Sequence, residues 1–201
     1  MIIITLSTWQ TLISGMLALL AAYLTIRTMN KNHHDLLERK RLAFKGNLHL
    51  IATQLCSIYE KHYIEIENAL IDEKSAVNIS FPEKEIQSLL QGIEFLDNSS
   101  AQYIDKFIEL NQVFYARLKR NQALGYEKVI DLLELYALVE NFFDYSRGET
   151  SSLIYQRIKN AKLHSTFRVL EGVQRPLGTA RHLNDAYIKK VADTINQLRP
   201  T

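Results

Sequence analysis

The sequence predicts an all-α protein with one N-terminal transmembrane helix, a long stalk-like helix and a bundle of about five further helices. Glycine (7) and proline (3) are scarce among the 201 residues, whereas an all-β fold would need many turns. The chain starts with a long run without charge, and apolar residues recur at helical spacing after it. We expect residues 1–28 to form a transmembrane anchor and residues 29–201 to form a cytoplasmic α-helical domain.

The first segment carries no Asp, Glu, Lys, Arg or His before Arg27. As a helix, residues 2–26 would be about 37 Å long, and a hydrocarbon core needs ~20 apolar residues to be crossed. A cleaved signal peptide is the alternative, but the basic residues that usually precede its apolar run are missing. The segment therefore predicts a membrane-spanning helix in contact with the lipid bilayer.

Basic residues are concentrated directly after this apolar run. Six of them occur before position 46, against two acidic residues: Arg27, Lys31, Arg39, Lys40, Arg41 and Lys45, with Asp35 and Glu38. The positive-inside rule then places the N-terminus outside and the rest of the chain in the cytoplasm, so we expect an inner-membrane protein. We expect anionic headgroups to contact Arg27, Lys31, Arg39, Lys40 and Arg41.

Small side chains recur within the anchor at every fourth position. Ser14, Ala18 and Ala22 share one side of the predicted helix, with Gly15 beside them. Such a stripe lets two helix backbones approach closely in lipid, where packing drives association. We predict that this face packs against another copy of the chain and makes it a homo-oligomer. The alternative is that alanine and serine are simply common in membrane anchors.

The predicted stalk helix extends from His33 to about Leu70 and carries one regular apolar stripe. Its members alternate at spacings of three and four residues: Leu48, Ile51, Leu55, Ile58, His62, Ile66 and Ala69. This regularity suits packing in a bundle or against a neighbouring subunit. The single cysteine, Cys56, lies on the same helix, and we expect it to be buried and inert.

Turn and cap residues divide the rest of the bundle. The polar stretch 72–81 predicts a loop, and Pro82 with the acidic residues after it predicts a helix start. The run Asp-Asn-Ser-Ser at 97–100 ends that helix and caps another, which extends to about Gln122.

The most apolar helix, at about 127–145, is the predicted centre of the core, and Gly148 follows its end. We expect the next helix to begin at Thr150 or Ser151 and to end near Gly172. The last helix follows Pro176 and Gly178 and extends to about 198. In the helix that ends near Gly172, five residues are expected to face the core: Leu153, Ile154, Ile158, Ala161 and Phe167.

Arg157 and His164 form the one constellation that could carry chemistry. An arginine can stabilise charge on a phosphate, and a histidine at this spacing on a helix can serve as acid and base. Chance also produces the spacing, because Arg175 and His182 repeat it, and an ordinary helix histidine is the alternative reading. The sequence shows no metal-ligand cluster, P-loop or nucleophile elbow, so we expect neither a metal nor a cofactor.

The Arg157 and His164 pair resembles that of HEPN domains, small all-helical domains that cut RNA. The whole layout resembles the small membrane accessory proteins of type VI-B CRISPR systems: one N-terminal membrane helix, a basic exit and a helical domain with a divergent HEPN-like pair. That resemblance implies assembly into ring-like membrane pores and a role in RNA-guided antiviral defence. Ile158 follows the arginine, where active HEPN nucleases usually carry a polar residue, and this departure puts RNA cleavage in doubt.

The sequence thus predicts a self-associating, non-enzymatic membrane protein that forms pores or perturbs the membrane in bacterial antiviral defence. A membrane-tethered RNase of HEPN type is the alternative, and RNA would be a partner only in that case. A third reading is a passive membrane adaptor that docks a cytoplasmic protein partner on the helical bundle.

Overall fold

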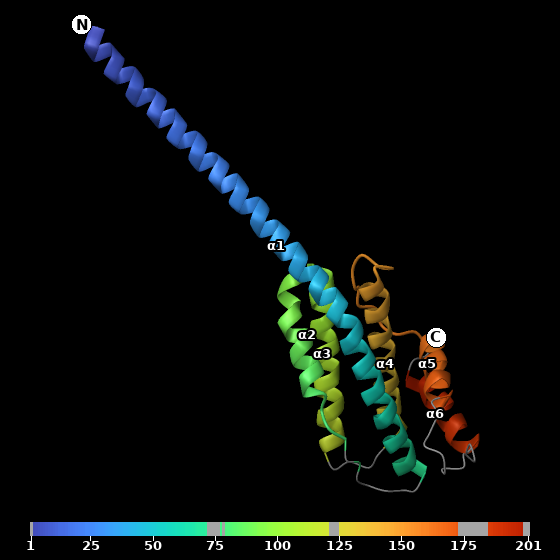
Figure 1. The fold of residues 1–201 in the computed structure, drawn as a ribbon. Helices are drawn as coiled ribbons and strands as arrows, with labels where there is room; N and C mark the ends of the chain where they lie inside the picture. Colours follow the sequence, from blue (N-terminus) through green and yellow to red (C-terminus); the bar gives the residue numbers. More distant parts are fainter. Residues whose placement is uncertain (1, 72–76, 78, 121–124, 173–184, 199–201) are drawn as a thin grey trace. The chain divides into compact units, whose positions relative to one another are not determined.

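The computed structural model describes residues 2–71, 77, 79–120, 125–172 and 185–198. Within them the chain forms six α-helices and one short 3-10 helix, η1, and no strand (Figure 1). The elements are α1 (Ile2–Ile71), α2 (Glu83–Gly92), η1 (Ile93–Phe95), α3 (Asn98–Lys119), α4 (Tyr126–Arg147), α5 (Asn160–Gly172) and α6 (Asp185–Leu198). The all-α prediction, with one long N-terminal helix and five further helices, is confirmed.

Two compact units divide the chain, Met1–Ala43 and Phe44–Thr201. The first unit consists of the N-terminal part of α1, which we define as residues 2–43. The second contains the C-terminal part of α1, residues 44–71, and the helices α2 to α6. The predicted anchor and stalk are one uninterrupted helix, and no proline interrupts its hydrogen-bond ladder.

The core of the second unit is built around α4. This helix packs on α3, α5 and α6, and its side chains are buried on most of its circumference. Phe142 of α4 is completely buried, and its ring centroid lies 5.2 Å from that of Phe107 and 5.7 Å from that of Tyr103 in edge-on contacts. The prediction of a central, mostly apolar helix is confirmed, because side chains on most sides of α4 are buried.

The apolar stripe of the stalk helix belongs to this same core. Leu48, Leu55 and Ile66 are completely buried, and His62 is 6% exposed. Polar contacts join the same helix to its neighbours: the Tyr59 hydroxyl donates to Asn111 of α3, and the Tyr136 hydroxyl of α4 donates to Glu60 over 3.1 Å. The stripe therefore packs within its own bundle, which was one of the two alternatives that its spacing left open.

The predicted helix boundaries are confirmed where a local signal marks them. Pro82 directly precedes α2. The Asp97 carboxylate accepts from the Ser100 N–H at 3.0 Å and caps α3. Gly148, with φ of 77°, ends α4 in the left-handed conformation that favours glycine.

The helix predicted from Thr150 or Ser151 is wrong in its start, because α5 begins only at Asn160. Residues 153–159 are non-helical: Leu153 inserts into the core, and its N–H donates to the Ser100 hydroxyl at 2.9 Å. That tertiary hydrogen bond and the burial of Leu153 replace a first helical turn. Ile154 and Ala161 are exposed, against prediction, whereas Phe167 is buried as expected. The predicted start of the last helix, near Gly178, lies outside the described residues.

Candidate functional site

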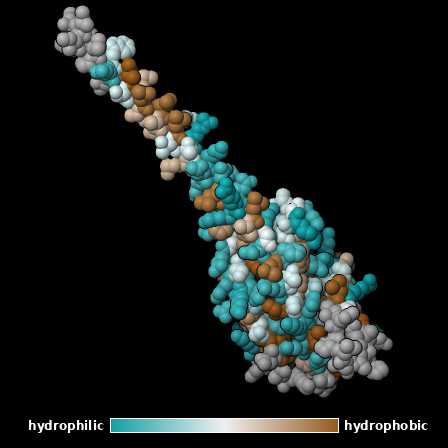
Figure 2. Space-filling view, in the orientation of Figure 1, coloured by the Kyte–Doolittle hydropathy of each residue, from teal (hydrophilic) through white to brown (hydrophobic). Residues whose placement is uncertain are grey.

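The N-terminal part of α1 exposes apolar side chains on all its sides. It contains an 18-residue window that is long and apolar enough to cross a membrane, and none of that window is buried within the chain. Leu17 is 60% exposed and Leu19 is 73% exposed, although the two side chains point in different directions around the helix. Figure 2 shows these apolar residues gathered along the helix, before the hydrophilic stretch that follows.

Exposure of this kind is unfavourable in water. Burial of one large apolar side chain is worth roughly 1.5–3 kcal/mol, and contiguous apolar surfaces usually mark contact with a membrane or another protein. The backbone of a continuous helix satisfies its own hydrogen bonds, which is the condition for crossing hydrocarbon. The segment is therefore suited to lipid by its length, its composition and its hydrogen bonding.

The predicted packing stripe meets no other part of the described chain. Ser14, Ala18 and Ala22 are exposed, and a Cβ added to Gly15 would find nothing within 4 Å. The small side chains thus leave an open strip of helix surface that another helix could approach. Their role in self-association stays a prediction.

The basic residues that follow the apolar run are spread along the same helix. Arg27, Lys31, Arg39 and Lys40 are exposed, whereas Arg41 is partly buried. Because the helix is continuous, Arg39 lies about 18 Å along the axis from Arg27, whereas Lys31 lies only about 6 Å from it. Screening acts over about 8 Å at physiological salt, so the prediction of headgroup contact is strongest for Arg27 and Lys31.

The second unit has a groove of about 510 Å³ beside α4. Its walls are Tyr103 of α3, Asn141 and Asp144 of α4, the non-helical residues of the stretch 150–159, and Lys162 of α5. The non-helical chain before α5 forms one wall of the groove.

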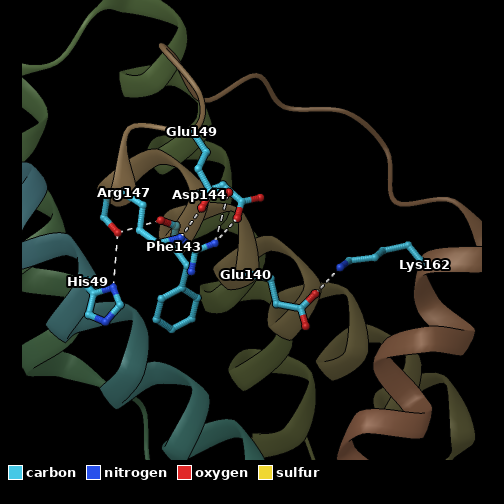
Figure 3. Close-up of polar contacts among 8 residues, drawn as sticks. His49, Glu140, Phe143, Asp144, Arg147, Glu149 and Lys162 are labelled. Atoms are coloured by element: carbon cyan, nitrogen blue, oxygen red, sulfur yellow. Dashed lines mark hydrogen bonds and ion pairs between the residues drawn. The ribbon is translucent and has the colours of Figure 1, made fainter.

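Ion pairs engage the acidic side chains around this groove. Glu140 pairs with Lys162 between α4 and α5, and Asp144 lies 2.8 Å from the Arg147 guanidinium (Figure 3). Arg147 also contacts Glu149 at 2.6 Å, and that partner and hydrogen bond hold the pKa of the Glu149 carboxyl below its usual value. The carboxylates near the groove are thus already engaged by cations.

The two side chains that the sequence offered as a catalytic pair have different neighbours in the structure. Arg157 is exposed on the non-helical stretch and lines the groove, so its predicted place on a helix is wrong. His164 lies on α5, about 200° around the helix from the groove residue Lys162, and its Nε2 is 3.4 Å from Asn196 Oδ1 of α6. Joint action of Arg157 and His164 stays a prediction, without a shared contact among the described residues.

The remaining chemically interesting side chains have structural surroundings. Burial raises the pKa of the Cys56 thiol to about 12, so it stays protonated and a poor nucleophile. Burial lowers the pKa of His62 to about 4, and its Nδ1 lies 2.9 Å from the Tyr115 hydroxyl. Within the described residues, no cluster of three or more His, Cys, Asp or Glu could hold a metal ion.

Sequence reasoning missed the groove, although one signal was available. Three basic residues, Arg157, Lys159 and Lys162, occur within six positions. Their convergence on Asn141 and Tyr103 depends on packing between α3, α4 and α5, which no spacing in the sequence reveals.

Comparison of the chain with protein-family models, with curated proteins and with solved structures gave no match.

Proposed function

We propose that this chain is a self-associating single-pass protein of the bacterial inner membrane. The observation that supports it best is the apolar window in α1, none of which is buried within the chain. A helix of residues 2–26 measures about 37 Å, which is enough to cross a hydrocarbon core of about 30 Å with some tilt. The six basic residues after it favour a cytoplasmic position for the helical bundle.

Self-association is supported by the open strip at Ser14, Gly15, Ala18 and Ala22. In lipid, close backbone approach is favourable because dispersion contacts between helices replace looser contacts with acyl chains. The buried stripe of residues 48–69 is already used inside the bundle, so the membrane helix is the better candidate for the contact between copies.

A pore-forming or membrane-perturbing role in antiviral defence is part of this proposal and rests on the resemblance to type VI-B accessory proteins. A type VI-B effector encoded beside this chain would support it. No observation on the described residues favours the RNase alternative, because Arg157 and His164 face different neighbours.

Topology is tested with reporters fused after Thr201. A reporter that is active only in the cytoplasm should work, and alkaline phosphatase, which needs the periplasm, should stay inactive. Recovery of the full-length chain in the soluble fraction without detergent would contradict the membrane anchor itself.

Self-association is tested by cross-linking in mild detergent. Ala18→Leu keeps the segment apolar but places a bulky side chain on the strip, so cross-linked oligomers should fall several-fold. Leu20→Ile is the matched control, because residue 20 lies about 200° from residue 18 around the helix. A monodisperse monomer of the native chain in several mild detergents would favour the passive adaptor instead.

Enzymatic activity is tested with purified protein and single-stranded RNA. We expect no cleavage by the native chain. Metal-independent cleavage that both Arg157→Ala and His164→Ala abolish, without loss of folding, would establish the RNase alternative.

A further inference from the structure

The groove beside α4 has the size and the lining of a small-molecule site. Its volume of about 510 Å³ lies within the range of roughly 300–1,000 Å³ that is typical of ligand pockets. One wall is apolar, with Leu153 buried, Ile158 partly buried and Ile154 63% exposed. The Ile154 side chain is therefore available to cover the apolar body of a ligand.

Two cationic side chains at the groove make no ion pair among the described residues. Lys162 is paired with Glu140, but Arg157 and Lys159 make neither an ion pair nor a side-chain hydrogen bond within the part of the chain that the structure describes. The acidic side chain of the lining, Asp144, is engaged by Arg147, which also pairs with Glu149. The groove therefore carries positive charge that an anion would neutralise.

Amide groups of the same groove are also open to a ligand. Asn141 uses its Nδ2 to donate to the Tyr103 hydroxyl at 2.9 Å, and its Oδ1 makes no hydrogen bond among the described residues. Gln156 is exposed beside it on the non-helical stretch. These groups could accept hydrogen bonds from the polar edge of a planar molecule and donate hydrogen bonds to it.

We propose that this groove binds a nucleotide: its phosphate lies between Arg157 and Lys159, and its base lies against Ile154 within reach of Asn141. A guanidinium matches phosphate oxygens with two parallel hydrogen bonds, and a lysine adds a second charge. Both cations are exposed, so water screens them and binding is modest, with a Kd on the order of 100 µM.

The test is isothermal titration of the full chain in mild detergent with four probes: adenosine monophosphate, adenosine, glycerol 3-phosphate and inorganic phosphate. Adenosine monophosphate should bind most tightly of the four. The double variant Arg157→Gln with Lys159→Gln should lower the affinity for adenosine monophosphate at least tenfold. Because both side chains are exposed, this double variant should have the same unfolding temperature as the native chain.

The matched control removes two cations from another place. Lys119 and Arg120 are exposed at the end of α3, and Lys119 lies about 24 Å along the helix from the groove residue Tyr103. Lys119→Gln with Arg120→Gln should change the affinity less than twofold. An equal loss of affinity for adenosine monophosphate in the two double variants would overturn the proposal, since it would reveal a general effect of charge.

The other probes separate a nucleotide from the phosphate of a lipid headgroup. Ile154→Ala should lower the affinity for adenosine monophosphate at least threefold and leave the affinity for inorganic phosphate unchanged. Glycerol 3-phosphate that binds as tightly as adenosine monophosphate, or no binding by any probe, would overturn the nucleotide assignment. The groove lies entirely in the second unit, so this result is independent of membrane insertion and self-association.

Discussion

The two parts of α1 are both helical and rich in apolar residues, yet they have opposite surroundings. In residues 12–43 the apolar side chains are exposed, as Leu17 and Leu19 illustrate, whereas in residues 44–71 Leu48 and Leu55 are completely buried. The difference lies in the placing of polar residues. Residues 2–26 of the first part carry no charged side chain, whereas the second part has an apolar face and a polar face.

This comparison separates helix formation from helix environment. Local backbone hydrogen bonds form both parts of the helix. Neither part contains a proline, which would break this ladder. An amphipathic pattern directs the second part into a protein core, and an apolar pattern without a polar face makes the first part suited to contact with lipid. The same type of substitution should therefore have different consequences in the two parts.

The largest contrast is expected from a lysine in place of leucine. Leu55→Lys would bury a charge without a partner in the bundle core and should destabilise folding by about 4 kcal/mol or more. Leu42→Lys, at a position 63% exposed in the first part, should change stability by less than about 0.5 kcal/mol. Thermal unfolding followed by near-ultraviolet circular dichroism, which reports the packed tyrosines, distinguishes them. Similar losses in both variants would contradict the comparison.

A charge in the middle of the apolar run tests the other half of the comparison. Leu19→Arg should oppose membrane insertion by about 3 kcal/mol, the usual cost of an arginine near a helix centre. The bundle should keep its unfolding temperature, because Leu19 is 73% exposed and contributes nothing to the core. The fraction of protein that resists carbonate extraction measures insertion. An unchanged membrane fraction would count against a spanning helix at this position.

Histidine protonation should affect the two parts differently. Burial lowers the pKa of His62 to about 4 from the ordinary 6.5, so the unfolded chain binds the proton more readily between these values. The contribution of neutral His62 to the free energy of unfolding is complete above pH 6.5 and is lost as the pH falls toward 4. The loss amounts to at most about 3 kcal/mol.

The measurement is urea unfolding in mild detergent from pH 7 to 4. His62→Gln should flatten the decline relative to the native chain, whereas His33→Gln, which alters an exposed residue of the first part, should not. An identical pH profile for native chain and His62→Gln would show that His62 is solvated in the folded state.

Two glycines give the smallest contrast. A Cβ at Gly92 would overlap the Phe44 ring, with the nearest atom at 1.8 Å, whereas a Cβ at Gly15 meets nothing within 4 Å. Gly92→Ala should therefore destabilise the bundle by about 1–3 kcal/mol through overpacking. Gly15→Ala should leave the unfolding temperature of the bundle unchanged. If Gly92→Ala is as stable as the native chain, the Phe44 ring is free to move.

Much of the fold could be predicted from the sequence because local chemistry sets it. Scarce glycine and proline excluded an all-β fold, Asp97 capped α3, and Gly148 supplied the left-handed residue at the end of α4. The charge-free run after Met1 determined the apolar, exposed part of α1. These features depend on residues within a few positions of one another, where hydrogen bonding and side-chain volume act directly.

Tertiary structure decided what local chemistry left open. The stripe through Leu48 and Leu55 fitted either a bundle or a neighbouring subunit, and only the packing of α1 on α3 and α4 assigned it to the chain's own core. The start of α5 was mispredicted because Leu153 and the distant Ser100 hydroxyl, 53 residues apart, form a contact that competes with a helical turn. The groove with Arg157 and Lys159 includes that non-helical stretch and residues of α3, α4 and α5, so it depends on contacts between residues far apart in the sequence.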